Sequence, residues 1–126
     1  MRKGYLQKLY PCPVRRYVQT MSLRDNPELI ALYRKAHSEP EFWPEIKDDI
    51  RSVGILEMEI FILGTRLVMI VDMPDALDWD EVMTKLARLP RQAEWEDHVA
   101  QFQNCAKGTT SDEKWQMMER IFHLYK

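Results

Sequence analysis

The 126-residue chain has few cysteines and no long apolar segment. Its two cysteines, Cys12 and Cys105, have no second Cys or His at a metal-binding spacing, so we expect free thiols in a reducing cytosol. The longest apolar segment, residues 54–64, contains two glutamates and is far shorter than the ~20 residues that span a bilayer. Residues 1–14 are basic but lack the apolar core of a signal peptide. We therefore expect a cytoplasmic protein with no membrane segment, in which an N-terminal tail, residues 1–14, precedes one domain, residues 15–126.

The chain also lacks a strong charge of either sign and the common cofactor motifs. Its formal net charge is −2 and its Lys and Arg residues form no stripe, which argues against a nucleic-acid partner. It contains no glycine-rich dinucleotide fingerprint, no phosphate loop, and no zinc-protease or serine-hydrolase motif. The three histidines, His37, His98 and His123, are too scattered to predict a metal site. An enzyme with this sequence is expected to use cofactor-free acid/base chemistry.

What is present is a regular alternation of apolar patterns. The period-2 segments predict strands at residues 15–23, 55–63, 66–73 and 114–125. The 3.6-residue patterns, with Pro and capping residues at their starts, predict helices at residues 27–37, 43–54, 78–89 and 90–103, followed by a loop at residues 104–113. This order predicts an α+β fold of ferredoxin-like type, with paired helices on one face of a four-stranded antiparallel sheet.

The second face of such a sheet would have no helix layer. The strands at residues 55–63 and 66–73 are too apolar to face water, so we expect a homodimer through the sheet faces. Trp115 and Phe122, on the last predicted strand, are expected in the core.

His37 is the strongest candidate for acid/base chemistry. It ends an apolar helix four residues after Tyr33, so both side chains point to one helix face. The exposed carbonyls of the last helical turn favour the imidazolium form, which suits a proton donor near neutral pH. A histidine that only ends a helix and bonds a carbonyl is the commoner arrangement, and spacing alone favours it.

Three further residues have two interpretations each. Trp95 shares a helix face with apolar residues and is most simply a core residue, although an indole can also stack on a sugar ring. Glu57 and Glu59 lie on a strand beside apolar neighbours, where carboxylates either bind sugar hydroxyls or face water at the sheet edge. The residue types leave both interpretations open.

Several stretches together resemble a known family. "LYRKAH", "WPE", "MEIFILGTRLVMIVDM", "AEWEDHVAQFQ" and "RIFHL" occur in an order and at distances similar to those of the L-rhamnose mutarotase family, which includes L-fucose-type relatives. The similarity covers residues 15–124. It implies a dimeric α+β barrel of ferredoxin-like protomers and an isomerase that interconverts the α and β anomers of a 6-deoxy-L-hexose. It places the family's proton donor on His37, its substrate-contacting tyrosine on Tyr33 and its pocket aromatic on Trp95.

Departures from the family pattern leave the sugar open between L-rhamnose and L-fucose. Two extra residues follow His37, Met58 stands where rhamnose-type members have a pocket tyrosine, and Glu96 replaces a second tryptophan. Met58, Glu59 and Glu96 therefore join Tyr33 and Trp95 as residues expected to contact the sugar.

The resemblance also implies a division of roles. His37 protonates the ring oxygen, Tyr33 orients the sugar or relays a proton, and Trp95 stacks on the sugar. The base for the anomeric hydroxyl is not assigned, and Glu59 and Glu96 are candidates. The alternative is a non-catalytic or monooxygenase-like dimeric α+β barrel that binds a ligand, because this architecture serves several functions. A catalytic pocket requires His37, Tyr33 and Trp95 to line one cavity.

Overall fold

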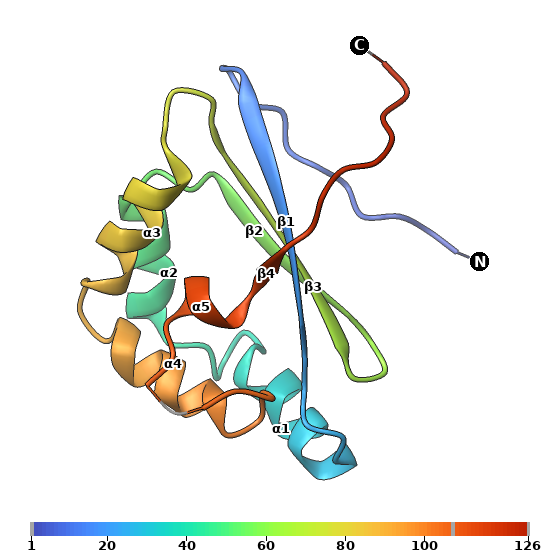
Figure 1. Ribbon diagram of the computed structural model, residues 1–126, viewed down its shortest axis with the longest axis vertical. Helices are drawn as coiled ribbons and strands as arrows, with labels where there is room; N and C mark the ends of the chain where they lie inside the picture. The colour runs from blue at the N-terminus through green and yellow to red at the C-terminus, as the bar shows by residue number, and fades with distance from the viewer. Residues whose placement is uncertain (1, 107, 126) are drawn as a thin grey trace.

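One antiparallel sheet carries the helices on a single face (Figure 1). The computed structural model describes residues 2–106 and 108–125. In chain order its elements are β1 (Val14–Ser22), α1 (Pro27–Ala36), α2 (Pro44–Ser52), β2 (Glu57–Leu63), β3 (Arg66–Pro74), α3 (Trp79–Ala87), α4 (Gln92–Ala100), α5 (Ser111–Lys114) and β4 (Gln116–Met117).

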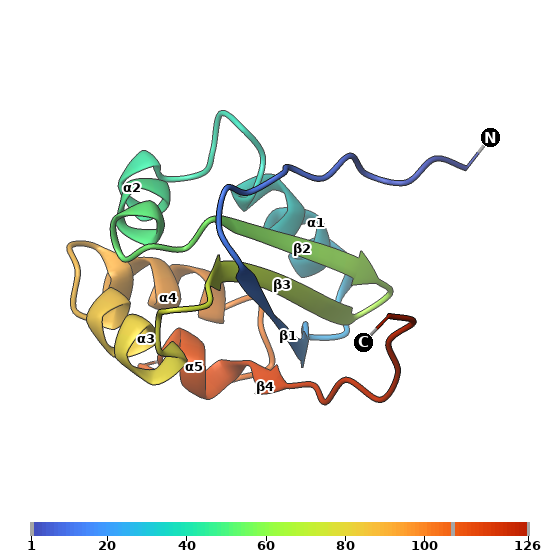
Figure 2. The ribbon, with the colours of Figure 1, turned by 90° about the horizontal axis from the view of Figure 1, so that it is seen from above.

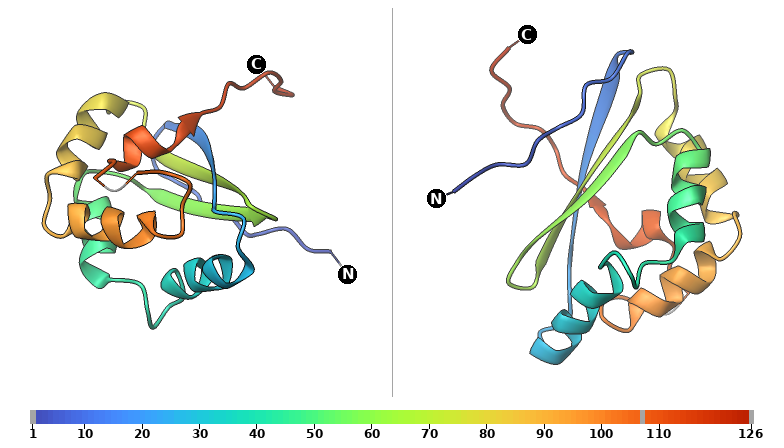
Figure 3. Two further views of the ribbon diagram at one scale, coloured as in Figure 1. Left: turned by 60° about the horizontal axis from the view of Figure 1, so that its bottom comes forward. Right: turned by 180° about the vertical axis from the view of Figure 1, so that it is seen from behind.

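The strand order confirms the predicted topology. The sheet runs β2-β3-β1-β4, and each strand is antiparallel to its neighbours. The connections that contain α1 and α2, and α3 to α5, pass over the same face, whereas both chain ends extend from the other side (Figures 2 and 3). The α+β, ferredoxin-like arrangement expected from the sequence is therefore present.

Local signals explain where the helices begin. The Asn26 side chain accepts hydrogen bonds from the backbone N–H groups of Glu28 (2.9 Å) and Leu29 (3.2 Å), and Pro27 takes the first helical position of α1. Asp78 caps α3 by the same kind of bond. The four predicted helices are confirmed as α1 to α4, with ends up to three residues shorter than expected.

The core lies between the sheet and the helices. Leu67, Met69 and Val71 on β3 are 2% exposed or less, and register places Ile62, Ile60 and Met58 of β2 beside them on the same face. The alternate residues form the opposite surface, which we call the outer face; its members include Arg16, Val18, Glu57, Glu59, Phe61, Val68, Ile70 and Asp72.

The last predicted strand is wrong in extent. Only Gln116 and Met117 pair with β1, and residues 118–125 have no helix or strand. Trp115 is buried as expected, but Phe122 is 74% exposed and not in the core. A strand needs a packed face as well as an alternating pattern, and the structure leaves the side chains of residues 118–125 exposed.

α5 is a second departure, because it lies where the sequence predicted a loop. The Thr110 side chain accepts a bond from the Glu113 backbone N–H, and the Glu113 carboxylate accepts one from the Thr110 backbone N–H. This capping box starts a single helical turn that ends at Lys114.

Residues 2–13 contain no helix or strand, and they follow the outer face of β2. The Lys8 ammonium lies 3.5 Å from the Glu57 carboxylate, and the Tyr5 ring contacts the edge of Phe61. Cys12 and Cys105 are both free thiols. Among the described residues, every helix is too short and polar to cross a membrane.

Candidate active site

The end of α1 positions Tyr33 and His37 as one unit. His37 follows the last helical residue, and its Nδ1 lies 2.9 Å from the Tyr33 backbone oxygen. Because a carbonyl can only accept, Nδ1 carries the hydrogen, and Nε2 is the nitrogen that can exchange a proton with a ligand. The two rings lie side by side, with centroids 4.3 Å apart.

Burial sets the proton affinity of this pair. It lowers the pKa of His37 below the ordinary value, against the opposing effect of the hydrogen bond to the Tyr33 carbonyl, and the nearby His98 lowers it further. The Tyr33 carbonyl favours the imidazolium form, as expected of a helix-end carbonyl, but burial outweighs it and the net shift of the His37 pKa is downward. Burial also raises the pKa of Tyr33, so its hydroxyl stays protonated and acts as a hydrogen-bonding group.

One cavity brings most of the predicted site residues together. Tyr33, His37, Met58, Trp95 and Glu96 all line a cavity of about 70 Å³ between the sheet and the helices, which we call the inner cavity. The requirement set by the sequence, that His37, Tyr33 and Trp95 share one cavity, is met.

Glu59 does not belong to this group. It lies on the outer face, because it pairs with Ile70 while the neighbouring Met58 and Ile60 point toward the helices. The sheet thus separates Glu59 from His37, and Glu59 does not line the inner cavity with the other residues expected to contact the sugar.

Aromatic rings enclose the His37 side of the inner cavity. The Phe42 ring centroid lies 5.6 Å from that of His37 and 4.7 Å from that of Trp95, and Trp95 meets His37 edge to face at 5.4 Å. The Trp43 ring also packs on Trp95, in an edge-to-face arrangement, and stacks on the His98 ring. These rings exclude water from the site and present aromatic surface to a ligand.

Glu96 contributes the cavity's carboxylate. Its Oε1 lies 2.8 Å from the Lys114 Nζ, and only 15% of its side chain is exposed. Burial raises the pKa of Glu96, although the attraction of Lys114 acts in the opposite direction. Glu96 and His37 thus line the same cavity, and the pKa of each is shifted by burial, as is common at functional sites.

The inner cavity opens beside a larger cleft. His37, Phe42, Ile50, Met58 and Ile60 line both the inner cavity and an outer cleft of about 410 Å³. The inner cavity is smaller than the ~150 Å³ that holds a benzene-sized molecule, whereas the cleft is within the ~300–1,000 Å³ range of ligand pockets. His37 stands where the two spaces meet.

Three residues of the inner cavity were not identified from the sequence. Gln92 and Gln103 are buried and line the inner cavity with Trp95, and Phe42 forms part of its wall. The signal for the glutamines was present: residues 92, 95, 99 and 103 follow one helical face, so polar residues interrupt an otherwise apolar stripe. Within the described parts of the chain, no three His, Cys, Asp or Glu side chains converge as a metal site.

Comparison with known proteins places this chain in a family. The family model described as L-rhamnose mutarotase matches residues 16–124. An L-fucose mutarotase of Xanthomonas campestris is 35% identical over 88% of this chain and 89% of its own length. A Dictyostelium discoideum protein whose name states no activity is 30% identical over 90% of this chain and 92% of its own.

A solved structure shows the same fold. The crystal structure of an L-rhamnose mutarotase from Formosa agariphila superposes with a TM-score of 0.65 at 20% identity, covering 88% of this chain and 99% of that one. The family match extends over nearly the whole domain and includes α1, the inner-cavity strands and α4. The chain belongs to the L-rhamnose mutarotase family.

Proposed function

We propose that the protein is a mutarotase that interconverts the α and β anomers of a 6-deoxy-L-hexose, with L-fucose preferred over L-rhamnose. The observation that carries this proposal is the single cavity lined by Tyr33, His37, Trp95 and Glu96. The relative named for L-fucose is 35% identical to this chain, against 20% for the structure named for L-rhamnose, which favours L-fucose.

The proposed reaction needs two coupled proton transfers. The His37 imidazolium gives its Nε2 proton to the ring oxygen, and the Glu96 carboxylate takes the proton of the anomeric hydroxyl. The bond between C1 and the ring oxygen breaks, and the open aldehyde rotates about C1–C2. Ring closure on the other carbonyl face returns one proton to His37 and the other to the new anomeric oxygen, so neither the enzyme nor the sugar changes its proton count.

The remaining cavity residues orient the sugar. The Tyr33 hydroxyl, kept protonated by burial, bonds a sugar oxygen, and the face of Trp95 packs on the ring or its methyl group. Met58 offers apolar surface to that methyl group from β2. Because the inner cavity is small, we expect Phe42, which stands between cavity and cleft, to move aside on binding.

The outer face supports the proposed homodimer. Val18, Phe61, Val68 and Ile70 give it an apolar centre that no helix covers, and two copies packed face to face would bury it. Sedimentation velocity should give twice the chain mass, and Val68→Glu should yield monomers. We also place the enzyme in the cytoplasm, where its free thiols stay reduced.

The test of the function is the rate of anomer exchange with purified protein. One-dimensional saturation-transfer NMR is recorded with L-fucose, L-rhamnose and D-glucose, each against an enzyme-free control. We expect exchange to be strongest for L-fucose, weaker for L-rhamnose, and at the enzyme-free rate for D-glucose.

Two outcomes would contradict the proposal in different ways. Stronger exchange of L-rhamnose would overturn the sugar preference but keep the reaction. Enzyme-free rates for all three sugars would overturn the reaction and favour the alternative, a dimeric α+β barrel that binds a ligand without turning it over.

A further inference from the structure

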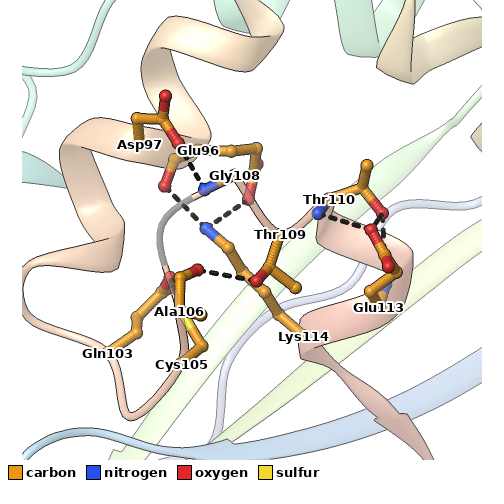
Figure 4. Close-up of polar contacts among 10 residues, drawn as sticks. All are labelled: Glu96, Asp97, Gln103, Cys105, Ala106, Gly108, Thr109, Thr110, Glu113 and Lys114. Carbon is orange, nitrogen blue, oxygen red and sulfur yellow. Dashed lines mark hydrogen bonds and ion pairs between the residues drawn. The ribbon is translucent and has the colours of Figure 1, made fainter.

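Lys114 is the most deeply buried charged group beside the site. Its side chain is 0% exposed, and its Nζ lies 2.8 Å from Glu96 Oε1 and 2.7 Å from the Glu96 backbone oxygen (Figure 4). One ammonium therefore binds both the carboxylate and the carbonyl of the same residue. This double contact restricts the rotation of the Glu96 side chain as well as balancing its charge.

The chain around Lys114 is built to hold it in place. The Thr110–Glu113 capping box starts α5 one turn earlier, and the Gly108 backbone N–H donates to Asp97 Oδ1 on α4 at 2.9 Å (Figure 4). The first bond set fixes the start of α5, and the second attaches Gly108 to α4. Lys114 thus approaches Glu96 from a fixed turn and not from a free loop.

Stability alone does not account for this pair. Removing two charges from water costs several kcal/mol per ion, and apolar residues of the same size often stabilise a core better. The pair also borders open space: Glu96 lines the inner cavity with His37, and it lines a second cavity of about 340 Å³ between α3, α4 and residues 108–112. A buried cation fixed on a cavity carboxylate is the arrangement expected where that carboxylate must carry charge.

We propose that Lys114 is a positioning residue that keeps Glu96 ionised and oriented to take the anomeric proton. This inference rests on the proposed mutarotase function. Burial raises the pKa of Glu96, and Lys114 is the group that opposes the rise. Without that cation the carboxylate would hold its proton at higher pH and could not act as the base.

Other charged or titratable groups face Glu96 but none replaces Lys114. They are Asp97 beside it on α4, Tyr33 on α1 and His37 just after α1 around the inner cavity, and Arg88 just after α3 and Asp112 on α5 around the second cavity. Among the described residues, Lys114 is the only cation that forms an ion pair with the Glu96 carboxylate within 4 Å.

The test measures the protonation of Glu96 and the rate in parallel. The Glu96 side-chain carboxyl is followed by carbon NMR against pH, and L-fucose exchange is measured over the same range. In Lys114→Gln we expect the Glu96 midpoint to rise by at least about one pH unit and the acidic limb of the rate to move equally. On the alkaline limb, where the protonation of His37 sets the rate of both proteins, the variant should come within about threefold of the wild type at the same pH.

Two matched variants sharpen the result. Lys114→Arg keeps the cation and should hold both midpoints near those of the wild type, whereas Lys85→Gln removes an exposed cation of α3 and should change neither. The proposal is overturned if the NMR midpoint of Glu96 does not move in Lys114→Gln. It is also overturned if this variant loses the same fraction of its exchange rate at every pH.

A third variant covers the case in which Lys114→Gln does not fold. Glu96→Gln keeps an oxygen for Lys114 but cannot take a proton, so we expect less than about 1% of the rate and no acidic limb. A wild-type rate and limb in that variant also overturns the proposal. Because the NMR titration does not need turnover, a wild-type protein inactive on every sugar refutes the proposed function separately.

Discussion

The two faces of the central sheet use charged and polar residues in opposite ways. On the helix side, His37 and Glu96 line one small cavity, and burial shifts the pKa of each. On the outer face, charged groups pair with each other: Arg16 holds Asp72 through two bonds of 2.8 and 3.0 Å, and Lys8 lies 3.5 Å from Glu57.

This difference fits a reaction site on the helix side of the sheet and a contact surface for a second copy on the outer face. Groups with shifted pKa values around a cavity can exchange protons with a ligand, whereas Arg16 and Asp72 hold each other on the outer face. The outer face has an apolar centre of Val18, Phe61, Val68 and Ile70, which suits contact with a second copy. Substitutions on the two sides should therefore have effects of different size and kind.

The largest expected effect is on the helix side, at His37. His37→Asn keeps a side chain that can bond the Tyr33 carbonyl but removes the Nε2 proton donor. We expect the catalysed anomer exchange to fall by ~10²–10⁴-fold, to near the enzyme-free rate. The measurement is saturation-transfer NMR with L-fucose, together with a thermal unfolding scan.

His123→Asn is the matched control for that variant, because His123 is exposed and is not among the residues that line the inner cavity. Its exchange rate should stay within a few-fold of the wild type. Near wild-type exchange in His37→Asn would contradict the assignment of the proton donor.

A smaller effect is expected when only the hydroxyl of Tyr33 is removed. Tyr33 is 3% exposed, and its ring packs on His37, so Tyr33→Phe keeps the shape of the site. We expect a loss of ~10-fold in kcat/KM, equal to about 1.4 kcal/mol, from one missing bond to the sugar. An unchanged kcat/KM in steady-state kinetics would remove Tyr33 from the set of sugar contacts.

The pH profile should be narrow, since the two titrating groups are shifted toward each other. His37 must be protonated, and its pKa lies below 6.5, so activity falls as pH rises through that lowered value. Glu96 must be ionised, and its pKa lies above 4.5, so activity falls as pH decreases through that raised value. After subtraction of the enzyme-free rate, kcat/KM should peak between these limits. A plateau extending well above pH 7 would contradict the role of the imidazolium.

The smallest effect is expected on the outer face. Glu59→Gln removes a carboxylate that the sheet separates from His37. Activity on L-fucose should stay within about twofold of the wild type, as for most surface substitutions. A tenfold or greater loss in the same exchange assay would mean that the outer face takes part in the reaction.

The sequence predicted the fold well because its signals are local. Asn26 and Pro27 start α1, Gly64 and Thr65 turn β2 into β3, and the apolar periods distinguish helices from strands. The last strand failed for a reason that is not local. Residues 118–125 include several apolar side chains, but they are exposed in the structure, because the described part of the chain offers no layer for them to pack against.

The candidate site was predictable only in part. The i, i+4 spacing of Tyr33 and His37 placed them together, and strand alternation could have excluded either Met58 or Glu59, since adjacent strand residues point to opposite faces. The lowered pKa of His37 and the pairing of Glu96 with Lys114 depend on burial and on contacts between distant segments. Neither the lowered pKa nor the ion pair can be predicted from a periodic pattern in the sequence.

The central claim, that the sugar binds in the inner cavity on the helix side, can be tested directly with the wild-type protein. The indole N–H signals of the four tryptophans are followed by nitrogen–proton NMR during titration with L-fucose. Trp95 lines the inner cavity, whereas the indole of Trp79 bonds Asp112 outside it. We predict that the Trp95 signal shifts with a saturable dependence while that of Trp79 stays in place. If the Trp95 signal does not shift while the backbone amide signals of Glu59 and Phe61 do, the result would contradict the account.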